Sequence, residues 1–510
     1  MSTTAKPIAT QPVAPAAKHA GGGTAVWAPV AATLLAIFYF ASSLYIAAHR
    51  VFWFDELFTV HIARLPGVGT IWTALGNGVD ALPPTYYLLV RGFDSLFGAN
   101  NIAARVPSAI ALAVGMLVIY DCARRLTDRV HGLIALCVAP CSFLPYYGYE
   151  ARSYAIYFML SALALWLWSY PRLSTRTQAA LFGGCFFVGG CFHYYFAMGL
   201  LPYFLWELLR WRPGQRPSAK LVCGIIGSVV AALLFSPFIL AFSHKFAGGY
   251  WNRPTLRELQ IIYSQIFPDG LLLLALIMVW LALLRAEQPA AEDVSLAPMS
   301  SSEAVGWLFL SIPLAAYVVA ALKTNAYFSR YFIGVIPGVA VAFASLMWRH
   351  FRRNPRASMG VLLLLAGWGL AAQLTVAQHP EKVEATGIRE FLQVESVPHV
   401  EGKRYLVFSE PLLFLEAQQY AAHPEQVVLL LPSDFSRQPK PGPDPYLHER
   451  LELNLSPYYP LQFWTLDDLR RHQLDAALID PDEQALRDVQ RAGMQVRPRL
   501  GAPMTIAYLQ

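Results

Sequence analysis

Residues 27–48 read WAPVAATLLAIFYFASSLYIAA, an apolar stretch that contains no charged side chain. About 20 mainly apolar residues are enough for a helix to cross the hydrocarbon core of a membrane. Residues 179–209 are long enough for a tight hairpin of two shorter spans that breaks near His193. Other apolar stretches centre on residues 104–121, 131–147, 155–169, 220–243, 269–284, 304–322, 331–348 and 359–377. The sequence therefore predicts a mainly α membrane protein, a polytopic helical bundle of about 11 transmembrane helices.

The distribution of charge gives this bundle an orientation. The chain is 56% hydrophobic and 14% charged, and its basic residues gather in short segments after alternate spans. Basic loops mark the cytoplasmic side of a membrane. These residues are Arg124, Arg125, Arg129, Arg172, Arg176, Arg210, Arg212, Arg216, Lys220, Arg349, Arg352, Arg353 and Arg356. We therefore expect a multi-pass protein of the plasma (inner) membrane with a cytoplasmic N-terminus, and the net charge of +6 does not call for a nucleic-acid partner.

The chain divides into three parts. Residues 1–25 are rich in Ala, Pro, Thr and Gly and are expected to form a disordered cytoplasmic tail. Residues 26–377 form the membrane domain, with outer loops at 49–103 and 244–268. Residues 378–510 have ordinary soluble composition, and short apolar runs such as RYLVFS and LDAALID alternate with helical segments. This alternation predicts an extracytoplasmic α/β domain.

The second outer loop and the C-terminal domain carry weaker signals. Residues 255–267 (TLRELQIIYSQIF) are apolar at roughly helical spacing and could lie in the membrane interface. Residues 436–445 (SRQPKPGPDP) are a Pro-rich loop or linker. The six cysteines fall in or beside spans, so the C-terminal domain has no disulfide framework and no zinc spacing.

An acidic pair opens the first outer loop. Asp55 and Glu56 follow the aromatic run Val51–Phe54 directly after the first span. A partly desolvated carboxylate at this depth could act as a general base toward an acceptor hydroxyl. The alternative is a solvated loop start beside an aromatic belt. We take Asp55 and Glu56 as candidate catalytic residues.

Further along, the same loop supplies three candidate substrate-binding residues. Asp80 precedes Pro83-Pro84, which is a rigid entry to a helix that contains Tyr86. Arg105 lies at the head of the second span. The alternatives are a helix start with Asp80 near its cap, and an arginine that reaches for the interface.

The later outer turns supply four more candidates. Glu150 and Arg152 form an opposite-charge pair in a very short turn, where Arg152 could hold a lipid phosphate bidentately. His193 lies at the tip of the 179–209 hairpin, and Arg330 lies among aromatics at the mouth of a later span. A self-paired turn, a structural histidine and a snorkelling arginine are the respective alternatives.

Under the predicted topology, all these charged candidates lie on one side of the membrane. A carboxylate base combined with guanidinium groups suits the displacement of a phosphate leaving group, because the cations take up the negative charge that develops. A divalent cation near the carboxylates is compatible with this chemistry, but no ligand cluster requires one. The sequence therefore neither requires nor excludes a metal ion near Asp55 and Glu56.

Short motifs that occur in order along residues 26–350 resemble those of the GT-C superfamily of integral membrane glycosyltransferases. The closest likeness is to the bacterial members of glycosyltransferase family 39. This family groups protein O-mannosyltransferases with the lipid A aminoarabinose transferase. These motifs are Asp55-Glu56, Asp80–Tyr87 (DALPPTYY), Ala104–Ser108 (ARVPS), Tyr149–Tyr154 (YEARSY), His193–Tyr195 (HYY) and Ser329–Phe332 (SRYF) with Pro337.

The resemblance implies inverting transfer of a sugar from a polyprenyl-phosphate donor at the outer face. It places the base at Asp55 and the groups that hold the lipid phosphate at Arg152 and Arg330. Unlike eukaryotic protein mannosyltransferases, the chain has no large outer domain inserted between its later spans, so the acceptor stays open among a glycan, a lipid and a protein hydroxyl. Two other functions remain as alternatives, a lipid or polysaccharide transporter and a membrane scaffold. The transporter is disfavoured because the sequence shows no internal repeat.

Overall fold

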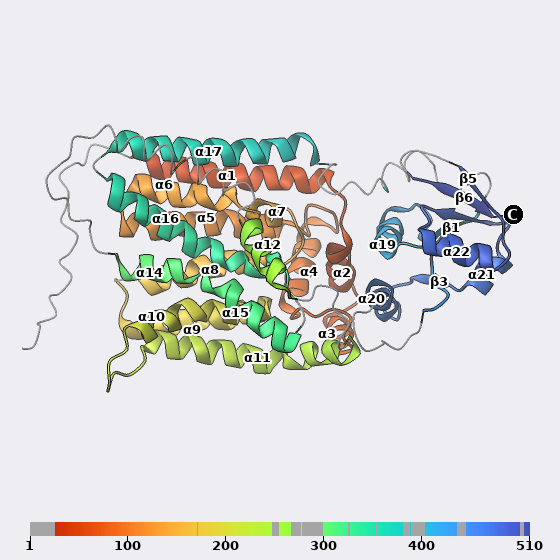
Figure 1. The fold of residues 1–510 in the computed structure, drawn as a ribbon, viewed down its shortest axis with the longest axis horizontal. Coiled ribbons are helices and arrows are strands. Elements are labelled where there is room, and N and C mark those ends of the chain that lie inside the picture. The colour runs from red at the N-terminus through yellow and green to blue at the C-terminus, as the bar shows by residue number, and fades with distance from the viewer. Residues whose placement is uncertain are drawn as a thin grey trace, which may run out of the picture.

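The computed structural model describes residues 26–170, 172–246, 254–266, 277, 299–324, 327–352, 354–380, 388, 403–435, 445–499 and 504–509. The predicted tail at 1–25 lies outside these residues. So do nearly all of the predicted span at 269–284 and of the predicted linker at 436–445. The rest of the chain forms a bundle of helices joined to a smaller domain that contains a sheet (Figure 1).

Six helical segments of the described chain are long and apolar enough to cross a membrane. Two shorter apolar helices, Arg129–Cys141 and Tyr154–Ser169, accompany them. The six segments are Trp27–His49 (α1), Val106–Leu126 (α5), Ala219–Lys245 (α11), Ser301–Leu322, Ser329–Phe351 and Pro355–Gln378 (α17). The prediction of a polytopic helical membrane protein is confirmed, whereas the predicted count of about 11 spans stays a prediction.

Several of these segments are interrupted. Ser301–Leu322 comprises α14 (Ser301–Leu308), α15 (Ser311–Val319) and the start of η3 (Ala320–Thr324). Ser329–Phe351 starts as η4 (Ser329–Val335) and continues as α16 (Ile336–Phe351), where Pro337 occupies the first turn. Proline is favoured there because its missing N–H has no partner within the helix anyway. Other helices of the bundle are α6 (Arg129–Val138), η1 (Ala139–Cys141), α7 (Leu144–Gly148), α8 (Tyr154–Ser169) and α12 (Leu256–Ile266).

The 179–209 segment breaks where the sequence predicts. Helix α9 (Thr175–Phe192) ends at His193, and η2 (Tyr194–Leu200) and α10 (Leu201–Leu209) follow. The Phe196 ring of η2 packs 5.0 Å from the Phe186 ring of α9, so the chain folds back on itself. A hairpin keeps the two ends of the segment on the same side of the bundle. This agrees with a cytoplasmic position for the basic residues that follow it, Arg210, Arg212, Arg216 and Lys220.

Glycines let α9 and α11 pack closely. A Cβ atom built on Gly227 would lie 2.1 Å from the Gly183 carbonyl oxygen. A Cβ atom on Gly183 would meet the Cys223 carbonyl oxygen at 2.8 Å. Such small residues are how membrane helices bring their backbones together when lipid competes equally for apolar side chains.

The first outer loop of the prediction is itself helical. It contains α2 (Phe54–Ala63), α3 (Val68–Gly76) and α4 (Thr85–Phe97), which lie between the bundle and the C-terminal domain (Figure 1). We call this end of the bundle the domain end. Helix α2 starts with Asp55 and Glu56 in its first turn, where carboxylates favour the positive end of the helix dipole.

The C-terminal part of the described chain combines helices with a mixed β-sheet. Its sheet has the order β3-β2-β1-β4-β6-β5, in which the first four strands are parallel to one another and β6 is antiparallel to both of its neighbours, β4 and β5. The strands are β1 (Tyr405–Phe408), β2 (Val427–Leu430), β3 (Gln462–Trp464), β4 (Ala476–Ile479), β5 (Val496–Arg499) and β6 (Ile506–Leu509). The helices are α19 (Pro411–Tyr420), η6 (Pro424–Gln426), α20 (Leu447–Leu455), α21 (Leu466–Arg471) and α22 (Glu483–Arg491).

Helices α19 and α20 join the domain to the bundle. The Phe52 backbone N–H donates to the Tyr420 hydroxyl at 2.7 Å, across a separation of 368 residues. The Tyr459 ring lies 3.9 Å from the His61 ring, and Leu415 and Leu455 belong to the same apolar core as the bundle. The domain therefore packs directly on α2.

Candidate active site

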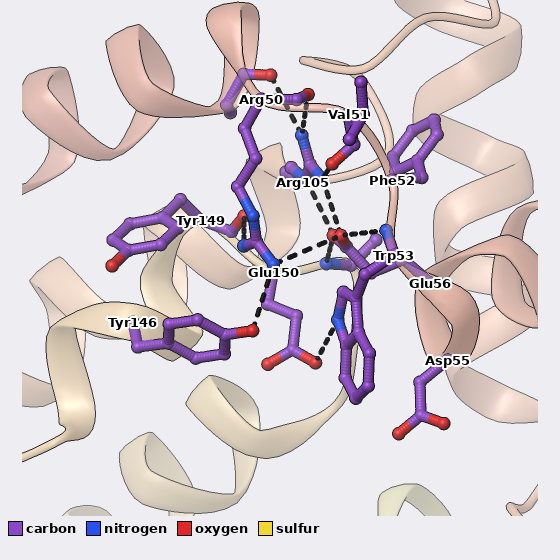
Figure 2. Close-up of polar contacts among 12 residues, drawn as sticks. Arg50, Val51, Phe52, Trp53, Asp55, Glu56, Arg105, Tyr146, Tyr149 and Glu150 are labelled. Carbon is purple, nitrogen blue, oxygen red and sulfur yellow. Dashed lines mark hydrogen bonds and ion pairs between the residues drawn. The ribbon is translucent and has the colours of Figure 1, made fainter. Parts of the chain in front are cut away.

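A closed network surrounds Glu56, which is fully buried (Figure 2). Its carboxylate accepts from Arg105 Nε at 2.7 Å and Arg105 Nη2 at 2.6 Å, and from the Ala151 N–H at 2.6 Å. The Trp53 N–H, at 3.3 Å, completes the set. Burial alone would raise the pKa of Glu56, but the Arg105 and Arg50 guanidinium groups outweigh it and hold the pKa below its usual value. Glu56 is therefore ionised and enclosed by donors.

Arg105 gives all five N–H groups of its guanidinium to the protein. Besides its two bonds to Glu56, it donates to the Ala47 and Arg50 carbonyls at 3.0 and 2.9 Å and to the Val51 carbonyl at 2.7 Å. Its side chain is completely buried. Arg105 thus ties the end of α1 to the start of α2 and has no N–H group left for the substrate role expected from the sequence.

The pair Glu150 and Trp53 extends this network. Trp53 Nε1 donates to Glu150 Oε1 at 2.9 Å, and Glu150 is buried. Arg50 lies 4.9 Å from the centre of the Tyr146 ring and donates to its hydroxyl at 3.0 Å. The 149–154 turn is thereby held against the start of α2, which fixes the residues on either side of Asp55.

Asp55 points away from the Glu56 network (Figure 2). Its Oδ2 atom lies 3.1 Å from Nη1 of Arg330, and the two side chains are 19% and 22% exposed. This pair therefore keeps access to its surroundings, in contrast to Glu56. Trp53, Phe328 and Tyr331 flank the Arg330 guanidinium at 4.8–5.9 Å from their ring centres.

A second carboxylate–guanidinium pair adjoins the first. Arg152 Nη1 donates to Asp80 Oδ2 at 3.1 Å and to the Asp55 carbonyl at 3.2 Å. Tyr87 donates to the same Asp80 oxygen at 2.7 Å. Burial opposes the charged form of Arg152, but Asp80 and Asp55 outweigh it and hold the pKa of Arg152 well above its usual value. Arg152 Nε is buried without a hydrogen-bond partner, so this arginine retains a donor for another group.

His193 and Tyr86 take different places. The His193 ring is buried among Tyr154, Tyr157 and Tyr331, each about 5.5 Å away between ring centres. Burial, with the nearby arginines, lowers the pKa of His193 to about 3, so its ring is neutral. Tyr86 is buried against Ser108, with the two oxygens 2.9 Å apart, and packs the core below the site.

The structure thus separates the predicted residues into two groups. Asp55, Asp80, Arg152 and Arg330 form a cluster of two carboxylates and two guanidinium groups, in which the Asp55–Arg330 pair is partly exposed and Arg152 is buried, with His193 at the edge of the cluster. Glu56, Arg105 and Glu150 form the buried support, and Tyr86 lies in the core. Among the described residues, no group of three or more His, Cys, Asp or Glu side chains is arranged to hold a metal ion.

Two residues of this region escaped the sequence reasoning. Arg50 contacts the Glu56 carboxylate at 3.9 Å. The sequence does mark Arg50 as a candidate, because it is a basic residue at the end of a span on the side of the membrane where basic residues are sparse. His448, from the C-terminal domain, stacks edge-on against Phe54 at 4.9 Å, next to Asp55. No local pattern links residues so far apart in the chain.

Comparisons with known proteins bear on the fold. Residues 81–240 match the family described as Dolichyl-phosphate-mannose-protein mannosyltransferase, a stretch that contains Arg105, Arg152 and His193. The crystal structure of ArnT from Cupriavidus metallidurans bound to undecaprenyl phosphate superposes with a TM-score of 0.62 at 11% identity, over 95% of this chain and 98% of that one. The same protein in the apo state gives 0.59 at 13% identity, over 94% and 98%. No curated protein matches the sequence.

The chain is therefore a multi-pass membrane protein with the GT-C fold, the fold of a superfamily of integral membrane glycosyltransferases. This confirms the fold that the ordered motifs predicted. More particularly, the chain follows the ArnT architecture along nearly its whole length, with the C-terminal domain included in the superposition.

Proposed function

We propose that the protein is a glycosyltransferase that moves a sugar from a polyprenyl-phosphate-linked donor to an acceptor hydroxyl, with inversion at the anomeric carbon. The cluster of Asp55, Asp80, Arg152 and Arg330 carries this proposal, because it sets two guanidinium groups beside an accessible carboxylate at the domain end of a membrane bundle. The match to a dolichyl-phosphate-mannose transferase family supports a lipid-phosphate donor. So does the likeness to a structure that holds undecaprenyl phosphate.

Asp55 is the proposed base. Its carboxylate is ion-paired and partly exposed, so it can accept the proton of an approaching hydroxyl. The hydroxyl oxygen attacks the anomeric carbon as the bond from that carbon to the phosphate oxygen breaks. The electron pair of this bond leaves with polyprenyl phosphate, and the proton passes to Asp55.

Arg330 and Arg152 are the proposed phosphate-binding groups. Both are always charged, and a planar guanidinium suits the oxygens of a phosphate. Arg330 pairs with the Asp55 carboxylate. A phosphate that binds Arg330 would draw it from the carboxylate and leave Asp55 free to act as a base. Donor binding would thus prepare the base, while Arg152 stays anchored on Asp80.

Glu56 and Arg105 are proposed as positioning residues rather than as a base and a phosphate ligand. All four donors to Glu56 come from the protein, and Arg105 has no N–H group to spare. Their network fixes the first turn of α2 and hence the direction in which Asp55 points. Precise placement of a reacting group contributes several kcal/mol to a barrier, so their loss would lower the rate indirectly.

We propose that the cluster faces the outside of the plasma membrane. Arg105 lies just before α5 at the domain end, while Arg124 and Arg125 lie in its last turn. Arg349 lies in the last turn of α16, which also starts near the site. Arg124, Arg125 and Arg349 therefore lie at the opposite end of the bundle, as expected for a cytoplasmic face. Glycan, lipid and protein hydroxyls remain candidate acceptors.

The decisive experiment is transfer by purified protein in vesicles, with radiolabelled sugars linked to undecaprenyl phosphate and a cell-envelope fraction as acceptor. We expect Asp55→Asn to lower the transfer rate at least about 100-fold, the usual contribution of general base catalysis. Asp121→Asn is the matched control, because Asp121 also pairs with arginines but lies at the opposite end of the bundle. Full transfer by a folded Asp55→Asn protein would eliminate Asp55 as the base.

Topology needs its own measurement. We expect a reporter that is active only outside the cytoplasm to be active when fused after the C-terminal domain. Activity of a reporter that works only in the cytoplasm would place the cluster on the wrong side for this reaction.

A further inference from the structure

The start of η2 fixes the His193 ring in one tautomer. His193 caps η2, and its Nδ1 atom accepts a hydrogen bond from the Tyr195 backbone N–H at 3.2 Å. A ring nitrogen that accepts in this way carries no proton, so the proton of the ring lies on Nε2. Burial acts in the same direction, since it lowers the pKa of His193 to about 3. His193 is therefore an uncharged ring that presents one N–H group, at Nε2.

The protein itself gives this N–H group no acceptor. No described residue accepts a hydrogen bond from Nε2 of His193, which is buried. The rings around it belong to Tyr154, Tyr157 and Tyr331, with centres about 5.5 Å away, and aromatic faces are weak acceptors. A phenylalanine would fill the same space without the cost of a buried, unsatisfied N–H group. The histidine therefore points to a ligand that supplies the acceptor.

Two arginines of the candidate active site share this feature. Nε of Arg152 and Nε of Arg330 are also buried, and neither has a hydrogen-bond partner within the described part of the chain. The ion pairs of these arginines with Asp80 and Asp55 use their Nη1 atoms instead. Both guanidinium groups lie close enough to act electrostatically on His193. Three N–H groups in one region thus have the same need, which is an acceptor.

The chemistry of this set selects an anion. Two positive charges repel a cation, and a sugar hydroxyl carries no charge for them to attract. A phosphate has several acceptor oxygens and a negative charge that planar guanidinium groups bind well. The uncharged His193 ring adds a further N–H group for one of these oxygens without adding a third positive charge.

We propose that His193 binds the phosphate of the lipid-linked sugar donor through its Nε2–H group, beside Arg152 and Arg330, and stabilises the charge that this phosphate gains during transfer. The sugar donor is a phosphodiester with one negative charge. When the bond from the anomeric carbon to the phosphate oxygen breaks, the electron pair stays on that oxygen, and the phosphate becomes a monoester with a second charge. The proton of the acceptor hydroxyl passes to Asp55, while His193 keeps its own proton.

The phosphate reaches His193 by way of Arg330. The Arg330 side chain is 22% exposed, whereas His193 and Arg152 are buried. Tyr331 follows Arg330 in η4 and packs against the His193 ring. A phosphate that draws Arg330 from Asp55 is thereby brought toward Nε2. That this phosphate belongs to a polyprenyl lipid rests on the proposed function.

Equilibrium binding to the full-length protein in nanodiscs tests the contact without any transfer. Undecaprenyl phosphate is the probe, and undecaprenol, which has a hydroxyl in place of the phosphate, is the reference. We expect His193→Phe to weaken the binding of undecaprenyl phosphate about tenfold and to leave that of undecaprenol unchanged. His193→Gln carries an amide N–H near the position of Nε2, so its affinity should stay within about threefold of wild type. Both variants lose Nδ1, so their difference isolates the Nε2–H group.

A matched control lies in the same aromatic cluster. Tyr157→Phe removes the hydroxyl that donates to the Tyr195 carbonyl, so it disturbs the surroundings of His193 but leaves the Nε2–H group in place. It should bind undecaprenyl phosphate like the wild type. Equal affinity of His193→Phe and wild type, or a failure of His193→Gln to restore binding, would refute the phosphate contact. Inorganic phosphate that competes as well as undecaprenyl phosphate would make this a site for a free anion and refute the lipid assignment.

The vesicle transfer assay separates this inference from the proposed function. His193→Phe should lower kcat about 100-fold, the usual effect of losing one N–H group that faces developing negative charge, and His193→Gln should recover most of it. If the wild type transfers no sugar but binds undecaprenyl phosphate through His193, the proposed function fails and the contact stands. If the wild type transfers sugar and His193→Phe does so at the same rate, the role of His193 fails alone.

Discussion

Replacing Glu56 with glutamine changes one oxygen to an amide nitrogen and keeps the shape of the side chain. In the folded protein, Arg105 donates two hydrogen bonds to this carboxylate, and Ala151 and Trp53 donate one each. Glutamine would direct an N–H group at these donors and leave two buried arginines without their counter-charge. Removing one partner of a buried ion pair costs about 3–5 kcal/mol, so we expect the free energy of unfolding to fall by that amount.

Denaturant titration of the purified protein, followed by tryptophan fluorescence, measures this loss. Glu303→Gln is a matched control, since Glu303 is 1% exposed and pairs with Arg349 at 2.6 Å in another part of the bundle. We expect it to lose a comparable amount of stability while the folded fraction transfers sugar at the wild-type rate. Asp55→Asn should lose less than about 1 kcal/mol, because its ion pair is partly exposed.

The pH dependence gives a second test of the same pair. The pKa of Glu56 is lowered in the folded state, so its stabilising contribution is fully present above the ordinary carboxyl pKa of 4.5 and is lost as the pH falls below it. The stability difference between wild type and Glu56→Gln should therefore shrink in acid. A Glu56→Gln protein that is as stable as the wild type but inactive would refute the positioning role and make Glu56 a base.

Two further substitutions test the site and the bundle. Arg330→Lys keeps the charge but loses the planar guanidinium that faces Asp55, so kcat/KM for the lipid-linked donor should fall about 100-fold while the fold is retained. A kcat/KM within about threefold of the wild-type value would exclude bidentate phosphate binding by Arg330. Gly227→Ala places a methyl group 2.1 Å from the Gly183 carbonyl oxygen, so the free energy of unfolding should fall by about 1–3 kcal/mol in the same titration. Gly184→Ala, whose added methyl group has no heavy atom within 4 Å, should leave stability unchanged, and equal stability of the two variants would contradict the packing described between α9 and α11.

Hydropathy alone was enough to predict the membrane bundle, because a lipid-exposed helix must be apolar over its whole length. The length of the 179–209 stretch also predicted that the chain breaks near His193, directly after α9. The number of spans was harder to predict, because helices such as α8 (Tyr154–Ser169) are shorter than a helix that crosses the whole hydrocarbon core. The strands of the C-terminal domain were evident from short apolar runs, but their order in the sheet was not.

Within the site, sequence patterns identified most of the residues but not their relations. Asp55 and Glu56 are adjacent in the chain, yet a helical turn sends one toward Arg330 and the other toward Arg105. Nothing in the sequence distinguishes these two directions, because they depend on partners in distant segments. His448 could not be found at all, since its contact with Phe54 arises only from the docking of the C-terminal domain.

The bond between Phe52 and Tyr420 has a consequence for the order in which the molecule is completed. It joins residues separated by 368 positions, so the contact forms only after residue 420 has been made and the α/β domain has moved against α2. Contacts of such long range are among the last to form in folding. The surroundings of Asp55 are thus completed by a part of the chain that is synthesised long after α2. A truncated or half-inserted molecule would hold the membrane bundle and its charged cluster without the His448 ring of α20 that packs against Phe54.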